Sequence, residues 1–563
     1  RVRQLNKKTA EQGIRPLLKV LEHKYAGQLG VLKTLRHMRS HLVDTIVSLL
    51  AEESKDEKPD ELDRRLYLEE LYLPNVLVGH QLEDGAPVVY EPNPTYQNLF
   101  GKIEYTNLHG SVYTNYRMIR AGAIHRANGG YLLLDVDQVI EQPFVWDALK
   151  LAIKSGSIKM DLPQQDVGMV NAITLNPQPV DLDVKVILLG SRDLYYTLQD
   201  YDDEFDELFR VLVDFDYEIP VTRQSVFDFV GKVRHQVEQI GMTGISSKAM
   251  YRLGEYSLRM AEHQQKFSAH FAEVIELIHE AHYFASQQHN THLELDHIEI
   301  ALNAKKRRTG RVSHALLNDI KEGHVLIATE GKAVGKVNGL TVLDIGDTAF
   351  GTPARITSTV FAGASGVVDI EREVELGQPI HSKGVMLLNG YLGNKYAQHF
   401  PLTLSANIAL EQSYGHIDGD SASLGELVAL ISALTEIPCL QTLAITGSIN
   451  QYGEVQAVGG VNEKIEGFFD LCQHRGLTGT QGVIIPKSNA INLVLDATVI
   501  DAVKKGLFHI YTVETVDDAL SILMEQEAGK ISSKGRYPKN SINYHAVNRL
   551  YNIALIVNGG DGE

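Results

Sequence analysis

The sequence predicts a multidomain α/β protein, and three observations support this fold class. The chain has 563 residues, and at about 150 residues per domain this leaves room for three to four domains. Helical periodicity dominates residues 1–65 and again residues 223–312. In the remaining stretches short β-type runs alternate with helical ones, which is typical of α/β modules.

Composition and charge narrow the class of protein. Hydrophobic residues make up 44% of the chain and charged residues 22%, which excludes collagenous, disordered and disulfide-stapled chains. The 53 basic and 71 acidic residues give a net charge of −18, which argues against nucleic-acid or anionic-lipid partners. No apolar run in the sequence is long enough to span a membrane, and no secretory signal opens it. With only Cys439 and Cys472, we expect a reducing, cytoplasmic location.

The first domain is expected to be a helical arm over residues 1–65. Apolar residues from Val31 to Leu49 recur at helical spacing and leave one polar face, which predicts long helices in an antiparallel pair or an arm on a larger body. A coiled-coil interaction arm and a plain scaffold both fit this pattern. The charged stretch 52–63 indicates a connector.

Residues 66–222 are expected to form an α/β module. Apolar β-type runs at 131–134, 184–189 and 211–215 predict strands, and residues 142–155 predict a helix. A small helical domain should follow over 223–312, including a helix at 272–285. It ends in a basic cluster (Lys305, Lys306, Arg307, Arg308 and Arg311). We interpret this cluster as a solvated helix end rather than a contact with nucleic acid or an acidic partner.

Residues 313–526 again mix predicted strands, such as 357–361, 402–410 and 482–485, with helices. This pattern predicts a fourth domain, of α+β type. The remaining residues, 527–563, are expected to form a C-terminal tail, and the sequence assigns no role to it.

A candidate nucleophile lies in the segment 418–426, which reads DGDSASLGE and leads into an apolar helical pattern. Ser423 and Glu426 have the S-x-x-E spacing of a capping box, which predicts a helix start there and places Ser421 just before the first turn. The unpaired amides and positive end of a helix stabilise an oxyanion. A serine before a helix is more often a mere cap, so this segment alone leaves both interpretations open.

A candidate base follows in the helical pattern after Gly460. Lys464 adjoins its apolar face in the first turn, where burial and the positive helix end both favour a neutral amine. A pKa lowered from about 10.4 to about 7–8 would make this lysine a general base. The alternative is a surface lysine whose stem packs along Phe468. Residues 442–449 predict a strand interrupted at Gly447, where Thr446 either holds the lysine amine or simply favours the strand.

Together these motifs resemble the proteolytic domain of the Lon family of serine peptidases, in its B-type branch. The matching segments read DGDSAS, ITGSI and GGVNEKIEGFF, and 43 residues separate Ser421 from Lys464. The resemblance implies a Ser-Lys dyad with Ser421 as nucleophile, Lys464 as base, Thr446 as a supporting hydroxyl, and Asp418 as an acid that pairs with the lysine in an inactive state. It also implies unfolded polypeptide substrates, a homohexameric ring, and peptide hydrolysis that requires no metal or cofactor.

The upstream half resembles the AAA+ module and lid of the same branch. Residues 123–135 look like the approach to a Walker B strand that delivers Asp135 to magnesium, but Val136 stands where the catalytic glutamate is expected. Asp137 is one place too far along: in a strand it shares the face of Asp135 and does not simply replace the missing base. Ser191 occupies the position of a polar sensor, and Arg210 resembles an arginine finger, although a structural arginine fits equally.

The sequence contains no phosphate loop of the form G-x-x-x-x-G-K-[ST], and no arginine between Arg259 and Arg307 to act as a lid sensor. Either the ATPase module is degenerate, or the loop lies upstream of Arg1 in a longer chain, which we favour. ATP and Mg²⁺ binding therefore stay open, and hydrolysis is expected to be weak or absent. Three hypotheses follow: a Lon-like endopeptidase with weak ATP hydrolysis, an ATP-dependent Lon protease, and a non-proteolytic ring scaffold or adaptor.

Overall fold

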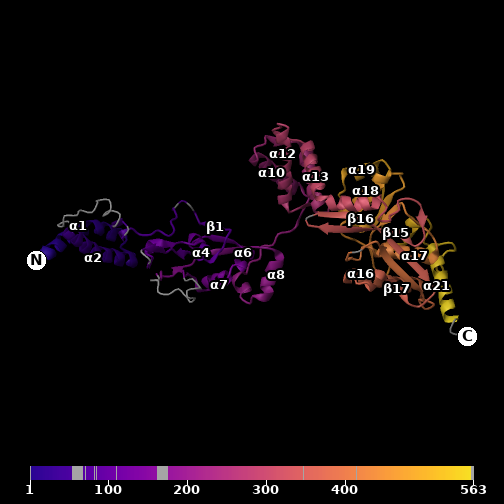
Figure 1. Ribbon diagram of the computed structural model, residues 1–563, viewed down its shortest axis with the longest axis horizontal. Coiled ribbons are helices and arrows are strands. Elements are labelled where there is room, and N and C mark those ends of the chain that lie inside the picture. The colour runs from indigo at the N-terminus through magenta and orange to yellow at the C-terminus, as the bar shows by residue number, and fades with distance from the viewer. Residues whose placement is uncertain are drawn as a thin grey trace. The chain divides into compact units, whose positions relative to one another are not determined.

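The computed structural model describes residues 2–52, 68–69, 71–81, 83, 85–108, 111–160, 175–346, 348–413 and 415–559. They belong to two compact units, Arg1–Asp214 and Phe215–Glu563 (Figure 1). The predicted mixture of helical and α/β regions is confirmed.

The first unit begins with an antiparallel pair of helices, α1 (Val2–Lys24) and α2 (Leu29–Glu52). A short turn joins them, and an ion pair between Lys7 and Asp44 links the start of α1 to the later part of α2. Leu18, Leu35 and Val47 are buried. The predicted helical pair is thus confirmed, whereas the connector predicted at 52–63 lies almost wholly outside the described residues.

A parallel sheet of order β1-β6-β9 forms the centre of the α/β region. Its strands are β1 (Val88–Glu91), β6 (Tyr131–Asp135) and β9 (Lys185–Leu189). The helices are α4 (Tyr96–Phe100), α5 (Ala123–Arg126), α6 (Val136–Glu141), α7 (Val145–Ser155), α8 (Arg192–Tyr201) and α9 (Phe205–Leu208). The short pairs are β2 (Lys102–Ile103) with β5 (Ile119–Arg120), β3 (Thr106–Leu108) with β4 (Ser111–Tyr113), and β7 (Ser157–Ile158) with β8 (Val180–Asp181).

Two of the three strands predicted in this region are confirmed, as β6 and β9, and the predicted helix corresponds to α7. The strand predicted at 211–215 is wrong, because these residues form no regular element and Val211 and Val213 are largely exposed. An apolar, β-prone run becomes a strand only where a neighbouring strand pairs with its backbone.

The second unit opens with a helical region, as predicted. Its helices are α10 (Arg223–Gln239), α11 (Ser247–Met260), α12 (Phe271–Gln287), α13 (Leu295–Thr309) and α14 (Arg311–Lys321). Two short strand pairs join them, β10 (Glu218–Pro220) with β12 (Lys266–Ser268) and β11 (Gly244–Ile245) with β13 (His292–Leu293). Thr222 and Ser246 cap α10 and α11, and the core includes Val233, Leu253 and Ile278.

The basic cluster at the end of α13 is more than a solvated helix end. Lys305 and Arg308 pair with glutamates of α12, and Lys306 forms an ion pair with Asp496 at 2.8 Å. Three of its cations therefore neutralise carboxylates of the same chain.

A seven-stranded mixed sheet of order β17-β18-β16-β15-β20-β23-β24 forms the rest of the second unit. Its strands are β15 (Lys336–Ile345), β16 (Thr348–Phe361), β17 (Gly366–Asp369), β18 (Ser405–Glu411), β20 (Leu443–Ile445), β23 (Gly482–Pro486) and β24 (His509–Val513). Strands β15, β20, β23 and β24 run parallel, and β16 is antiparallel to both β15 and β18. All three strands predicted in this region are confirmed.

Helices cover both faces of this sheet (Figure 1). One core holds α16 (Pro379–Tyr396), α17 (Ser423–Thr435), α20 (Val516–Leu523) and α21 (Ile542–Gly559), and the other holds α18 (Val461–Arg475) and α19 (Ala497–Lys504). In β20, Leu443 and Ile445 belong to the first core and Ala444 to the second. Because neighbouring residues of a strand face opposite sides, α17 and α18 lie on opposite faces.

Smaller elements complete the unit and lie near its loops. They are β14 (Lys332–Ala333) paired with β19 (Cys439–Leu440), β21 (Ser448–Ile449) paired with β22 (Val455–Gln456), α15 (Ile370–Glu373) and the 3₁₀ helix η2 (Lys487–Asn492). Strand β21 continues the chain from β20 after Gly447, as the interruption in the sequence predicts.

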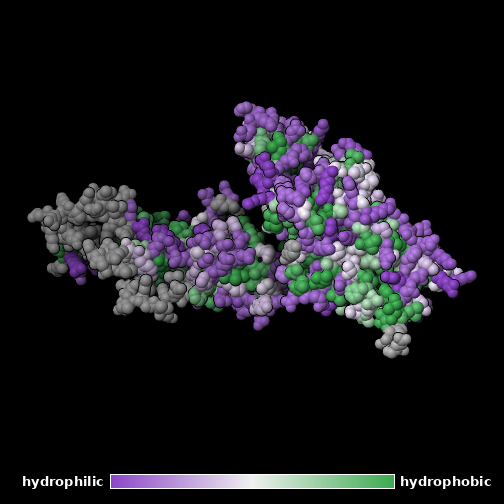
Figure 2. Space-filling model, turned by 45° about the vertical axis from the view of Figure 1, so that its right-hand side comes forward, coloured by the Kyte–Doolittle hydropathy of each residue, from purple (hydrophilic) through white to green (hydrophobic). Residues whose placement is uncertain are grey.

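The C-terminal region, for which the sequence predicts no role, contributes α21 to the α17 core. Ile542, Ala546 and Leu550 are completely buried there. The opposite side of the helix is exposed, and Figure 2 shows a hydrophobic patch where α21 ends, which includes Leu555 and Ile556. Among the described residues, no helix is long and apolar enough to cross a membrane.

Candidate active site

Three segments meet at the carboxyl end of β20. Thr446 follows the last residue of this strand, Ser421 precedes α17 by two residues, and Lys464 lies in the first turn of α18. Two backbone hydrogen bonds fix the nucleophile segment to the end of the strand: the Gly447 amide donates to the Ser421 carbonyl at 2.9 Å, and the Leu424 amide donates to the Gly447 carbonyl at 3.1 Å. Helices on opposite faces of the sheet thus present their first turns to one point.

The side chains of the three predicted residues lie within hydrogen-bond distance. Lys464 Nζ is 3.0 Å from Ser421 Oγ and 3.2 Å from Thr446 Oγ1. The Thr446 hydroxyl donates to the Ser421 carbonyl at 3.2 Å. Thr446 is therefore held by the nucleophile segment and accepts a hydrogen bond from the lysine amine.

Lys464 is a buried residue with a perturbed amine. Only 3% of it is exposed, so the alternative of a surface lysine is wrong. Burial lowers the pKa of Lys464 to about 8, although the negative charges of Asp420 and Glu463 act in the opposite direction. Since a neutral amine has a free lone pair, about a tenth of this lysine at pH 7 and about half of it at pH 8 can accept a proton.

The helix after the nucleophile begins as predicted, but its capping box does not form. Ala422 is the N-cap of α17 and makes no side-chain cap. Ser423 and Glu426 are each 1% exposed, and both have side-chain oxygens without a hydrogen-bond partner among the described residues. The capping-box prediction is wrong because α17 is buried on almost all sides, so these polar side chains point into the interior.

The amides beside the nucleophile are available to a ligand. Within the described part of the chain, the backbone N–H groups of Ser421 and Ala422 donate no hydrogen bond. They precede the first turn of α17, where the partial positive charge of a helix lies. This is the arrangement expected of an oxyanion-binding site.

Two aspartates precede Ser421 in the same segment, and their side chains make different contacts. Asp418 is exposed and accepts the Gly419 amide at 2.8 Å; its pairing with Lys464 stays a prediction. Asp420 accepts the Ser448 hydroxyl at 2.7 Å, and its charge acts on Lys464. No role was predicted for Asp420 from the sequence, although its place next to the candidate nucleophile indicates that its charge acts on the site.

Glycines allow α18 to approach the sheet closely. A Cβ atom at Gly351 of β16 would lie 2.0 Å from the Glu463 carbonyl, and one at Gly467 would lie 2.1 Å from the Gly351 carbonyl. Side chains at these two positions would push the lysine helix away from β16. The lysine position thus depends on residues that carry no reactive group.

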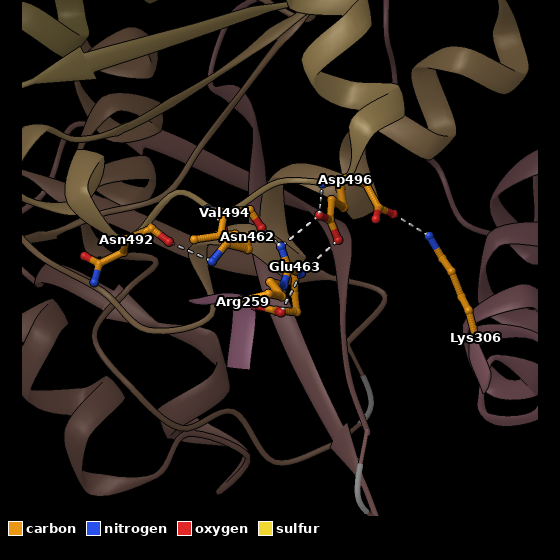
Figure 3. A network of polar contacts seen from close by, with 8 residues as sticks. Arg259, Lys306, Asn462, Glu463, Asn492, Val494 and Asp496 are labelled. Carbon is orange, nitrogen blue, oxygen red and sulfur yellow. Dashed lines mark hydrogen bonds and ion pairs between the residues drawn. The ribbon is translucent and has the colours of Figure 1, made fainter. Parts of the chain in front are cut away.

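A polar network from the helical region holds the start of α18 (Figure 3). Arg259 of α11 donates to Glu463 at 2.8 Å, to both oxygens of Glu466 at 2.9 Å and to the Val494 carbonyl at 2.6 Å. Asn462 accepts the Val494 amide at 2.8 Å. No local motif in the sequence predicts this contact, since Arg259 lies more than 200 residues before its partners.

The four residues predicted for nucleotide binding show no comparable convergence. Asp135 and Ser191 lie at the carboxyl ends of β6 and β9, but Asp135 accepts the Tyr90 hydroxyl at 2.6 Å, and Ser191 caps α8 by accepting the Leu194 amide at 3.2 Å. The exposed Arg210 donates to the Glu207 carbonyl at 3.0 Å. In the part of the chain that the structure describes, no hydrogen bond joins the predicted residues.

The predicted placement of Asp137 is wrong. Strand β6 ends at Asp135, and α6 begins at Val136. Asp137 is therefore an exposed residue of the first helical turn, where an acidic side chain favours the helix. Val136 is 4% exposed and belongs to the interior beneath the sheet end.

Three models of known protein families match parts of this chain. The LonB-like AAA domain matches residues 84–216, the LID domain of the archaeal LonB AAA+ ATPase matches 244–308, and the C-terminal proteolytic domain of Lon protease (S16) matches 407–526.

Individual relatives agree with these matches. A Lon protease homolog of Escherichia coli (strain K12) is 34% identical over 409 residues, which cover 72% of this chain and 68% of the relative. One from Haemophilus influenzae is 35% identical over 414 residues, covering 72% and 67%. An archaeal Lon protease from Archaeoglobus fulgidus is 25% identical over 478 residues, covering 81% and 71%. The chain belongs to the Lon protease family.

Proposed function

We propose that this chain is a serine endopeptidase in which Ser421 and Lys464 form the catalytic dyad. The observation that carries the proposal is a buried lysine amine 3.0 Å from a serine hydroxyl. A nucleophile and a base at this separation are within reach of direct proton transfer. Membership of the Lon family supports a serine protease.

The reaction follows from the contacts of the two groups. Neutral Lys464 takes the Ser421 proton as Oγ forms a bond to the carbonyl carbon of the peptide. The resulting ammonium then returns the proton to the leaving nitrogen as the C–N bond breaks, which gives an acyl-enzyme and a free amine. Water attacks the ester with Lys464 again as base, and the acid product leaves.

Two further groups support these steps. The free amides of Ser421 and Ala422 stabilise the oxyanion at the positive end of α17. Thr446 directs the lysine amine, since its hydroxyl donates to the Ser421 carbonyl and keeps a lone pair for Lys464. Asp418 is exposed next to this segment, and we propose it as the residue that pairs with the lysine when the site is inactive.

Substrates are proposed to be polypeptides, as the name protease of the relatives implies. The resemblance of the motifs to the Lon family is the basis for proposing that these substrates are unfolded and are degraded within a homohexameric ring. ATP and Mg²⁺ are not required for the chemical steps above. Weak or absent ATP hydrolysis is proposed because Val136 is buried where a water-polarising glutamate is needed, and because Asp137 lies in a helix. If nucleotide binds, Asp135 and Ser191 are the described residues at the carboxyl end of the parallel sheet.

Cleavage of casein, an unstructured substrate, tests the dyad. Ser421→Ala and Lys464→Ala should each abolish cleavage, whereas Ser423→Ala, two residues away in the same segment, should retain it. A peptidyl boronate should modify the wild-type chain and Ser423→Ala but not Ser421→Ala. Cleavage by Ser421→Ala would contradict the nucleophile assignment, and a wild-type chain inert to both reagents would favour a non-proteolytic scaffold.

A further inference from the structure

A second buried cluster of ionisable residues lies in the protease region, apart from the dyad. It consists of Asp369 at the end of β17, Glu371 in α15, His381 in the first turn of α16 and Glu426 in α17. Asp369 and Glu371 are 4% exposed, and His381 and Glu426 are 1% exposed. The proposed peptidase mechanism uses none of them.

Each of the four side chains has an atom without a hydrogen-bond partner among the described residues. These atoms are Asp369 Oδ2, Glu371 Oε2, His381 Nε2 and Glu426 Oε1. The other oxygens of two of the carboxylates are engaged: Asp369 Oδ1 accepts the Glu371 amide at 3.2 Å, and Glu371 Oε1 accepts the Leu410 amide at 2.8 Å. The backbone therefore fixes the carboxylates and leaves one oxygen of each for another partner.

The distances between the free atoms of Asp369, Glu371 and His381 suit ligands of one metal ion, and Glu426 lies outside this group. His381 Nε2 lies 3.5 Å from Asp369 Oδ2 and 3.8 Å from Glu426 Oε1. Ligand atoms of Asp369, Glu371 and His381 all lie within 4.8 Å of one another. Good hydrogen bonds would be about 2.7–3.2 Å, whereas ligands at about 2.0–2.2 Å from a tetrahedral ion are about 3.3–3.6 Å apart.

The charge of the cluster also calls for a cation. With all three carboxylates ionised, the cluster carries −3 when its imidazole is neutral and −2 when it is charged, and among the described residues only His381 lies within ion-pair distance of any of these carboxylates. Unpaired buried charges are strongly unfavourable. A divalent ion would bring the net charge to −1 or zero and would use the free atoms of Asp369, Glu371 and His381.

We propose that Asp369, Glu371 and His381 bind a structural divalent transition-metal ion, Zn²⁺ or Mn²⁺, with Glu426 beside the site. One imidazole nitrogen and two carboxylate oxygens suit these ions, whereas Mg²⁺ and Ca²⁺ prefer oxygen ligands alone. The ion would join β17, α15 and α16 through side chains from each.

The ion would also hold the nucleophile segment in place. His381 and Gly384 lie one turn apart on α16, and Ser423 and Glu426 lie one turn apart on α17. A Cβ atom at Gly384 would be 3.3 Å from Asp420 Cβ and 3.5 Å from Ser423 Cβ, so α16 packs directly on the segment that contains Ser421. An ion that joins α16 to β17 and α15 therefore fixes the position of the helix on which this segment packs.

The test measures metal content and stability rather than proteolysis. The full chain, without a histidine tag, is dialysed against a chelator and titrated with Mn²⁺ followed by electron paramagnetic resonance, and with Zn²⁺ followed by thermal unfolding. We expect one ion per chain and a higher Tm with metal. Glu371→Gln and Asp369→Asn should each weaken binding at least about tenfold. Glu373→Gln, an exposed carboxylate of the same short helix, should bind like the wild type.

Two results would overturn the proposal. The first is a wild-type chain that holds no ion and whose Tm does not respond to Zn²⁺ or Mn²⁺, because protons alone would then balance the cluster. The second is unchanged Mn²⁺ binding in both Glu371→Gln and Asp369→Asn, which would locate the ion elsewhere. Measuring binding as well as Tm distinguishes loss of the ion from a general loss of folding in the variants.

Discussion

Functional residues were predicted at the ends of two different sheets. The predicted side chains lie together at one sheet end, and among the described residues no hydrogen bond joins them at the other. At the end of β20, the side chains of Ser421, Thr446 and Lys464 lie within hydrogen-bond distance. Lys464 is 3% exposed, and burial lowers its pKa. At the ends of β6 and β9, Asp135 and Ser191 instead satisfy their hydrogen bonds locally, with Tyr90 and with the first turn of α8. Side chains engaged in local hydrogen bonds are less available to a ligand, so parallel strand ends alone do not make a site.

The largest expected effect is on peptide cleavage. Lys464→Met should lower kcat/KM for an unstructured substrate by about 10³-fold or more, because general base catalysis is lost. Asp135→Asn should leave the same rate within about twofold, since no step of the proposed chemistry passes through the first sheet. Initial rates on casein measure both. A large loss in Asp135→Asn would show that the two sheet ends are coupled even for substrates that need no unfolding.

The sequence predicted the protease site better than the nucleotide region, for physical reasons. The residues of the proposed dyad lie next to two local features that the sequence predicts, a helix start and a glycine before a helix. Both features are present in the structure. Asp137 was misplaced because a one-residue difference in where β6 ends changes a strand residue into a helix residue. Arg259 was missed because its contacts join helices that are distant in the sequence, and no local pattern reports them.

The fold shows the same division. Strands with a neighbour, such as β16 and β18, were predicted, whereas residues 211–215 have β-type composition and no strand structure. The capping box at Ser423 failed because burial around α17 outweighs the local hydrogen-bond preference. Tertiary contacts thus decided each of these differences.

The second prediction concerns stability, because a buried lysine is costly. Lowering the pKa from 10.5 to about 8 corresponds to about 3 kcal/mol of destabilisation, at about 1.36 kcal/mol per pH unit. Lys464→Met should therefore raise the free energy of unfolding by roughly this amount at pH 7. The unfolded lysine stays protonated up to about pH 10.5, so the gain is full below about pH 8 and vanishes by about pH 10.5. Urea unfolding of the wild type and Lys464→Met at pH 7 and pH 10.5 measures this gain in the free energy of unfolding. An equal gain at both pH values would exclude the buried charge of Lys464 as its cause.

The pH dependence of cleavage tests the same group. Because Lys464 must be neutral to act as base, kcat/KM should rise with pH through an apparent pKa near 8. Glu463 raises this pKa through its negative charge, so Glu463→Gln should move the rise to lower pH. A pH profile that is the same in the wild type and Glu463→Gln would contradict the assignment of Lys464 as the titrating base.

Arg259 links the helical region to the lysine helix and should act as a positioning residue. Arg259→Gln should lower kcat/KM by about tenfold, equivalent to about 1.4 kcal/mol of transition-state stabilisation. It should also move the rise in kcat/KM to higher pH. Glu463 loses its positive partner Arg259, so its negative charge stabilises the charged form of Lys464 more strongly. Arg252→Gln, on the same helix and paired with Glu299, is the matched control. A reduced rate with an unchanged pH profile would indicate general loss of structure instead.

The smallest effect is expected at the first sheet. Tyr90→Phe removes the hydroxyl that donates to Asp135 at 2.6 Å, and it should increase hydrogen exchange of the β6 amides by less than about fivefold, because one hydrogen bond at an exposed site contributes little. Cleavage of casein should not change, because neither residue takes part in the proposed chemistry. Asp135→Asn keeps an acceptor oxygen and should perturb exchange less than Tyr90→Phe does. If Tyr90→Phe instead strengthened binding of Mg²⁺ with ATP, the Tyr90 hydroxyl would be competing with the ligand for Asp135. Both sheet ends would then be binding sites, and only the one at Asp135 would be blocked by a side chain.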